Sequence, residues 1–151
     1  MQRKCLQLLV ILSMMLPAAQ HALSHCEIPC GIYDDQMRVK MIAEHITTME
    51  KSMKEILRLR TEGPTNYNQL VRWIVNKESH ANRLQEIVTQ YFMTQRIEID
   101  AKDYAKKITL LHKMLVHAMR CKQTTDVIHI GALRSLLKDF EVLYFGHSHN
   151  K

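Results

Sequence analysis

From residue 34 onward, apolar and polar side chains recur with the period of an α-helix. Between residues 34 and 62 the apolar positions are spaced by three and four, which places them on one helical face. These positions are Met37, Met41 or Ile42, Ile46, Met49, Met53, Ile56 and Leu57. Asp34 or Asp35 is a suitable N-cap for this helix, and Gly63-Pro64 is expected to end it.

The same periodicity predicts three further helices. They are expected over about Asn66 to Arg96, over about Asp100 to Cys121, and from a cap at Asp126 into the last residues of the chain. Their expected inward positions are Leu70, Trp73, Ile74, Leu84, Ile87, Val88, Tyr91 and Phe92, then Tyr104, Ile108, Leu111, Met114, Leu115 and Ala118, then Val127, Ile130, Leu133, Leu136, Leu137, Phe140 and Leu143. Four amphipathic helices with short connections predict an all-α fold, an antiparallel up-down four-helix bundle over residues 34–151.

The first 24 residues have a different character. Two basic residues precede an apolar run, Leu6 to Leu16, which is too short for a stable membrane span but typical of a signal peptide. Small residues in Ala22-Leu23-Ser24 fit the site cut by signal peptidase, so cleavage is expected just before His25. The sequence therefore predicts a cleaved signal peptide over residues 1–24 and export to the periplasm, the extracellular space or an organelle lumen. A membrane anchor is the alternative interpretation.

Cleavage leaves 127 residues, enough for one domain with one core. The leader removes two basic residues, so 19 basic and 15 acidic residues remain and the net charge is +4. No Arg/Lys block favours nucleic-acid binding, and no further apolar run favours a membrane span. A modest positive excess does attract small anions.

The cysteines indicate a site rather than a disulfide framework. Cys5 leaves with the leader, and Cys26, Cys30 and Cys121 remain. Exported domains that depend on disulfides usually carry more cysteines, in even numbers. Cys121, at the end of a predicted helix, is expected to be a free thiol without a catalytic role.

The residues that follow the predicted cleavage site form a candidate metal-binding segment, His25-Cys26-Glu27-Ile28-Pro29-Cys30-Gly31-Ile32-Tyr33. If His25 is the first residue, its free amine, the Cys26 amide and the Cys26 thiolate form two fused chelate rings. The Cys30 thiolate then closes a square plane of two nitrogens and two sulfurs. That plane suits nickel(II) or copper(II), whereas the spacing is not the one usual for zinc.

Nickel gains a further property from these donors. Thiolates and a deprotonated amide are strong anionic donors, and such donors are needed to make trivalent nickel accessible. The His25 imidazole can bind as a fifth, axial ligand when the metal is oxidised. Pro29 fixes the chain direction before Cys30, and Gly31 permits an unusual backbone angle after it, so residues 25–33 are predicted to form an irregular hook.

The motif His-Cys-x-x-Pro-Cys-Gly-x-Tyr resembles the amino-terminal hook of the nickel superoxide dismutases. Three further segments resemble the marine-type branch of that family. They are Asp34-Asp35-Gln36-Met37-Arg38, His45-Ile46-Thr47-Thr48-Met49-Glu50-Lys51 and Tyr91-Phe92-Met93-Thr94-Gln95-Arg96. The resemblance covers nearly all of the chain after the leader. It implies disproportionation of superoxide to dioxygen and hydrogen peroxide, with nickel cycling between its trivalent and divalent states.

The resemblance also implies roles for single residues. His25, Cys26 and Cys30 would hold one nickel ion per subunit, and Tyr33 would stand over the open face of the metal. In the family a Glu of the first helix holds the axial imidazole and an Arg of the second helix supports it. Glu44, preferred over Glu50, and His80 take those places here. The family assembles as a homohexamer, which is expected here too.

Two other functions fit the sequence less fully. Cys26 and Cys30 could form a small disulfide loop in an exported helical-bundle binding protein. Alternatively, the same terminus could carry nickel or copper without turnover. Within the whole nine-residue motif at the predicted cleavage site the disulfide loop is the minor interpretation, and a carrier would bind metal but show no dismutation. The dismutase is the favoured prediction.

Overall fold

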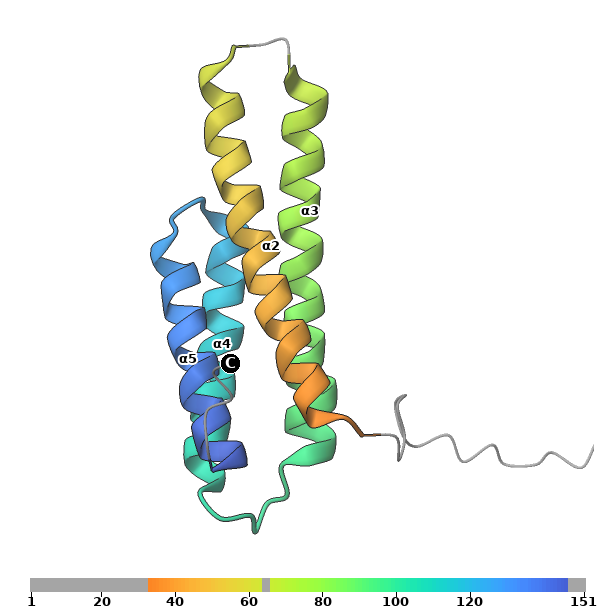
Figure 1. Ribbon diagram of the computed structural model, residues 1–151, viewed down its shortest axis with the longest axis vertical. Helices are drawn as coiled ribbons and strands as arrows, with labels where there is room; N and C mark the ends of the chain where they lie inside the picture. The colour runs from red at the N-terminus through yellow and green to blue at the C-terminus, as the bar shows by residue number, and fades with distance from the viewer. Residues whose placement is uncertain (1–32, 64–65, 147–151) are drawn as a thin grey trace, which may run out of the picture. The chain divides into compact units, whose positions relative to one another are not determined.

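A computed structural model describes residues 33–63 and 66–146, which form an antiparallel bundle of four helices (Figure 1). In chain order these are α2 (Asp35–Thr61), α3 (Tyr67–Glu86), which continues as the π-helical segment η2 (Ile87–Arg96), α4 (Tyr104–Gln123) and α5 (Ile128–Phe145). α2 and α4 each pack against both α3 and α5. The described part of the chain contains no strand, and none of its helices has the apolar length that a bilayer crossing needs. The predicted all-α four-helix bundle is confirmed.

α2 begins and ends where its sequence predicts, and a glycine closes α5. Asp34 caps α2, because its Oδ1 accepts the backbone N–H of Met37 at 2.8 Å. After α2, Gly63 adopts a positive φ of 84°, a conformation that glycine tolerates without strain. Gly146 has a φ of 79° and donates its N–H to the Val142 carbonyl at 3.0 Å, which closes the end of α5.

The start of α4 differs from the prediction. Residues 98–103 form turns instead of the first helical turn, with the Ala101 N–H donating to the Glu98 carbonyl at 3.1 Å. Asp103 adopts a left-handed φ of 59°, so the right-handed helix begins only at Tyr104. The N-cap of α5 is Val127 and not the predicted Asp126, although the Asp126 carboxylate accepts the Ile128 N–H at 2.9 Å.

The bundle interior is lined by side chains from every helix. The large apolar side chains that are fully buried are Ile42, Ile46, Met49, Met53, Leu84, Val88, Phe92, Leu111, Met114, Leu133 and Phe140. Burial of each such side chain stabilises the fold by about 1.5–3 kcal/mol. The predicted inward positions on η2, α4 and α5 supply most of them.

Four residues predicted to point inward are exposed instead. Met37, Leu57, Ile74 and Val127 keep 46%, 41%, 39% and 48% of their surface accessible. Leu57 lies near the carboxyl end of α2 and Ile74 in the first half of α3. These two helix ends extend past the loop that joins α4 to α5 (Figure 1). Met37 lies in the first turn of α2, and Val127 precedes α5. Periodicity identifies an apolar face but not the length over which a partner covers it.

Two buried reactive groups have structural roles. The ammonium of Lys77, which is 4% exposed, donates to the carbonyls of Lys122 at 2.6 Å and Thr124 at 3.2 Å. It thereby satisfies acceptors at the carboxyl end of α4, where a cation also suits the helix dipole. Cys121 is a fully buried free thiol, and burial raises its pKa to about 11. A thiol in that state is a poor nucleophile, as expected of a residue without a catalytic role.

Candidate active site at the amino end of α2

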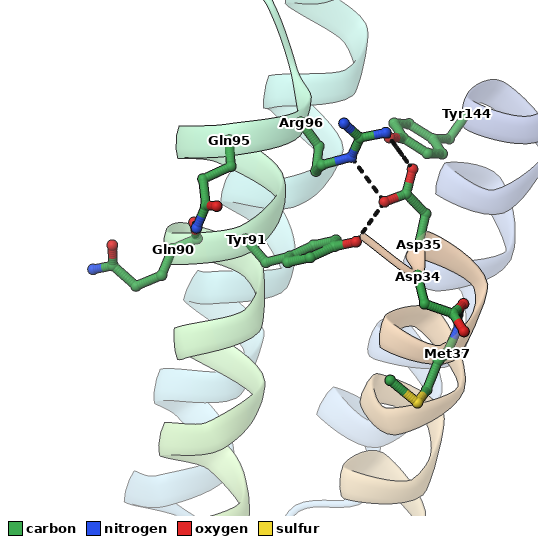
Figure 2. Close-up of polar contacts among 8 residues, drawn as sticks. All are labelled: Asp34, Asp35, Met37, Gln90, Tyr91, Gln95, Arg96 and Tyr144. Carbon is green, nitrogen blue, oxygen red and sulfur yellow. Dashed lines mark hydrogen bonds and ion pairs between the residues drawn. The ribbon is translucent and has the colours of Figure 1, made fainter. Parts of the chain in front are cut away.

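The carboxylate of Asp35 is the centre of a polar cluster at the amino end of α2 (Figure 2). The Tyr91 hydroxyl donates to its Oδ1 at 2.6 Å, and the Tyr144 hydroxyl donates to its Oδ2 at 2.8 Å. Arg96 makes a two-point contact, with Nε 2.8 Å from Oδ1 and Nη2 2.9 Å from Oδ2. The cluster therefore joins α2, η2 and α5 through one carboxylate.

The local sequence explains why this carboxylate is free to act as an acceptor. Asp34 takes the capping position, so Asp35 becomes the first residue of α2 and its side chain can point toward η2 and α5. A negative charge in the first turn is also favoured by the helix dipole. The Asp35 side chain is 16% exposed and that of Arg96 is 29% exposed, so the pair is partly shielded from water.

The cluster sets the ionisation of its members. Burial opposes the charge on Asp35, but the hydrogen bonds from Arg96, Tyr91 and Tyr144 outweigh it and hold its pKa below the usual value. Burial and the bond to Asp35 raise the pKa of Tyr91 to about 12, and the same two causes raise the pKa of Tyr144. At neutral pH one carboxylate therefore accepts from two protonated tyrosines and one guanidinium.

Tyr33, two residues before Asp35, lies against this cluster. Its ring centroid is 4.3 Å from the Arg96 guanidinium carbon, and its ring meets that of Tyr91 edge to face at 5.9 Å. Tyr33 remains 43% exposed, so one side of the ring is available to solvent. It is the one predicted catalytic residue that the structure describes.

A second guanidinium, that of Arg38, packs on the ring of Tyr91, which itself contacts Tyr33. Arg38 stands over the Tyr91 ring at 5.0 Å, and its Nε is buried without a hydrogen-bond partner among the described residues. Within residues 33–63 and 66–146, no carboxylate forms an ion pair with Arg38. Among the described residues, Arg38 therefore has no carboxylate partner, in contrast to Arg96, which pairs with Asp35.

The other two predicted helix residues lie further along α2 and α3. Glu44 is exposed, and His80 is half-buried with its Nδ1 3.1 Å from Nδ1 of His45. One ring of this pair must donate and the other accept, so both cannot be protonated at their Nδ1 atoms. Burial lowers the pKa of His45, helped by the charges of His80 and Arg83, and burial is also the main cause that lowers the pKa of His80.

The remaining predicted site residues, His25, Cys26, Pro29, Cys30 and Gly31, lie outside the described residues. Among the residues that are described, no three His, Cys, Asp or Glu side chains gather closely enough to hold a metal ion. The roles assigned to these residues, and to Glu44 and His80, stay predictions.

Sequence reasoning did not find the cluster around Asp35. Asp35, Tyr91 and Arg96 lie in segments that resemble the nickel superoxide dismutases, but Tyr91 was expected only as a core or interface aromatic. His45 also lies in such a segment but was assigned no role, and Tyr144 carried no signal. One clue was available in the sequence. Tyr91 and Arg96 are five residues apart, and side chains at that spacing share a helical face only in a π-helix.

Loss of the Asp35 charge is expected to reduce stability in a pH-dependent way. A carboxylate with a depressed folded pKa stabilises the protein above its unfolded value, near 3.8, and this contribution is lost as the pH falls through the folded value. We expect Asp35→Asn to lower the free energy of unfolding by about 2 kcal/mol at pH 7, with the difference from wild type shrinking below about pH 4. Urea unfolding of both proteins at a series of pH values measures this difference in the free energy of unfolding.

Asp139→Asn is the matched control, because Asp139 is an exposed carboxylate on α5. Its substitution should leave the free energy of unfolding within about 0.5 kcal/mol of wild type. A constant Asp35→Asn deficit from pH 7 to pH 2.5 would contradict the charge-dependent role of Asp35.

The described helices define a four-helix-bundle protein, and the sequence has a histidine and two cysteines, His25, Cys26 and Cys30, ahead of α2. A family model for nickel-containing superoxide dismutase matches residues 20–148. The chain therefore belongs to the nickel-containing superoxide dismutases. No curated protein and no solved structure gave a match in the corresponding searches.

Family membership settles the reaction and the metal. The protein is an oxidoreductase that converts superoxide to dioxygen and hydrogen peroxide, with nickel alternating between its trivalent and divalent states. The favoured prediction from the sequence is thereby confirmed over the binding protein and the metal carrier.

Proposed function

We propose that His25, Cys26 and Cys30 hold the nickel ion of this dismutase, and that Tyr33 controls access to it. The observation that carries the proposal is the donor set at the predicted mature terminus. It combines an amine, an amide, an imidazole and two thiolates, a combination that suits nickel. Bound nickel supplies the electron acceptance and donation that the reaction needs.

The described residues support a role of the α2 amino end in handling the substrate. Superoxide is a small anion, and the guanidinium of Arg38, which no carboxylate of the described residues pairs, lies beside the Tyr91 ring that Tyr33 contacts. A positive charge in this place raises the local concentration of anions. The exposed side of Tyr33 leaves its hydroxyl able to hold water near the incoming anion, while its ring limits the space available.

Maturation and assembly complete the proposal. Residues 1–24 direct export to the periplasm, the extracellular space or an organelle lumen, and signal peptidase then removes them. Removal exposes the His25 amine and leaves the hook (residues 25–33) and the bundle (residues 34–151). The mature chains assemble as a homohexamer. Tyr67, Val71 and Val75 support an interface, because these apolar residues of α3 are more than half exposed along one stretch of helix.

Substitution of either hook cysteine tests the ligand assignment. We expect Cys26→Ser and Cys30→Ser each to lose bound nickel and to reduce the dismutation rate by more than about 100-fold, because a neutral hydroxyl replaces an anionic thiolate. Nickel per chain measured by mass spectrometry and superoxide decay measured by stopped flow give the two readouts. Circular dichroism should show the bundle intact.

Cys121→Ala is the matched control for these variants. It removes the remaining cysteine of the mature chain from a buried position on α4, so nickel content and rate should both be retained. A Cys26 or Cys30 variant with full nickel content and full turnover would overturn the assignment.

A further inference from the structure

Tyr91 and Arg96 reach the same carboxylate oxygen although they are five residues apart. Tyr91 Oη lies 2.6 Å and Arg96 Nε 2.8 Å from Oδ1 of Asp35. In an α-helix of 3.6 residues per turn, side chains five apart point about 140° away from each other. A π-helix forms its hydrogen bonds over five residues, so the same two side chains lie one above the other. The π-helical winding of η2 is therefore what brings both to Asp35.

The winding is held by contacts of the same period. The Ile97 N–H donates to the Phe92 carbonyl at 3.0 Å. The side chains of Thr94 and Gln95 each donate at 2.8 Å to the carbonyl five residues earlier, on Thr89 and Gln90. Single-turn π segments often occur at functional sites, and this one extends over the ten residues Ile87–Arg96.

The contacts of Arg96 fix the orientation of its guanidinium group. A guanidinium that binds both oxygens of one carboxylate cannot rotate freely, because the two parallel hydrogen bonds define its plane. The Tyr144 hydroxyl, from α5, also binds Oδ2 and so holds the carboxylate in place. The flat group of Arg96 is then presented to the Tyr33 ring, whose centroid lies 4.3 Å away.

From this arrangement we propose that Arg96 is the positioning residue of Tyr33. Asp35 and Tyr144 hold Arg96, and η2 brings it into place. Its guanidinium fixes the Tyr33 ring, which also packs edge to face with the Tyr91 ring. This inference rests on the role proposed above for Tyr33. Arg96 acts on the reaction through Tyr33 and does not itself touch the substrate.

A double-mutant cycle on the purified enzyme tests the proposal. Arg96→Gln, Tyr33→Phe and the double variant are compared with wild type for the dismutation rate. The ring resonances of ¹³C-labelled tyrosine, assigned to Tyr33 by the Tyr33→Phe variant, report ring position without reference to turnover. Arg134→Gln is the matched control, because Arg134 forms an exposed ion pair with Glu50 at 2.8 Å.

The expected results are specific. Arg96→Gln should shift the Tyr33 resonances and lower the rate about ten-fold, whereas Arg134→Gln should change neither. In the Tyr33→Phe background Arg96→Gln should lower the rate no further. Arg96→Lys keeps the charge but loses the planar stack and the two-point contact, so it should also shift the resonances. The Arg96→Lys variant keeps the test decisive if Arg96→Gln fails to fold.

Two results would overturn the inference. One is a Tyr33 ring whose resonances do not move in either Arg96 variant. The other is a full additional loss of rate from Arg96→Gln when Tyr33 is already Phe. If the resonances shift but Tyr33→Phe turns over at the wild-type rate, the positioning contact stands and the role proposed for Tyr33 fails.

Discussion

A single alanine added before His25 is expected to abolish both nickel binding and superoxide dismutation in the mature protein. The added residue converts the His25 amine into an amide, which removes a nitrogen donor that is basic and terminal. It also separates the imidazole from the free end of the chain, so the fused chelate rings through the Cys26 amide cannot form with an amine.

Nickel per chain and stopped-flow superoxide decay measure this effect on protein whose first residue is verified by mass spectrometry. We expect nickel below about one tenth of the wild-type content and a rate reduced by more than about 100-fold. An alanine added after Lys151 is the matched control and should change neither value. Retention of nickel and turnover by the extended terminus would show that the metal is bound elsewhere.

Much of the bundle follows from the sequence because its signals are local. The Asp34 side chain bonds to an N–H three residues later, and Gly63 and Gly146 end helices through their own backbone angles. The apolar face of each helix is buried by packing against the apolar face of another helix. These features depend on neighbours within one or two turns, so periodicity and capping rules predict them.

The cluster around Asp35 could not be predicted in the same way. Its members come from residues 35, 91, 96 and 144, and their contacts depend on how three elements pack. The π-helical winding of η2 adds a second difficulty, because its apolar residues Ile87, Val88, Tyr91 and Phe92 also fit an α-helical face. An expectation of a continuous α-helix to Arg96 therefore placed the segment correctly but not its side chains.

The pairing of His80 shows the same limit. Its place in the second helix was predicted, but its contact with His45 links residues 35 positions apart through the packing of α2 on α3. Similarly, Leu57 and Ile74 have the spacing of core residues yet lie exposed, because the α2–α3 pair extends past its partners. The local sequence determines which face of a helix is apolar, whereas the packing of the whole bundle determines how much of that face is buried.

The second large effect is expected from Phe92→Ala, which should lower the free energy of unfolding by about 3–5 kcal/mol. The Phe92 ring is fully buried, and its centroid lies 5.1 Å from those of both Tyr91 and Phe140 and 5.6 Å from that of Tyr144. Its removal leaves a cavity among three aromatic rings on two elements. A loss of this size is a large part of the 5–15 kcal/mol that stabilises a typical domain.

Urea unfolding followed by circular dichroism at one fixed protein concentration measures the loss, so that assembly does not change the comparison. Ile99→Ala is the control, since that apolar side chain is 84% exposed and its removal should cost less than about 0.5 kcal/mol. Tyr91 and Tyr144 both bond to Asp35, so Phe92→Ala should also slow turnover at temperatures where the variant is still folded. A folded Phe92→Ala enzyme with the wild-type rate would mean that the hydrogen bonds to Asp35 keep Tyr91 and Tyr144 in place without the packing of the Phe92 ring.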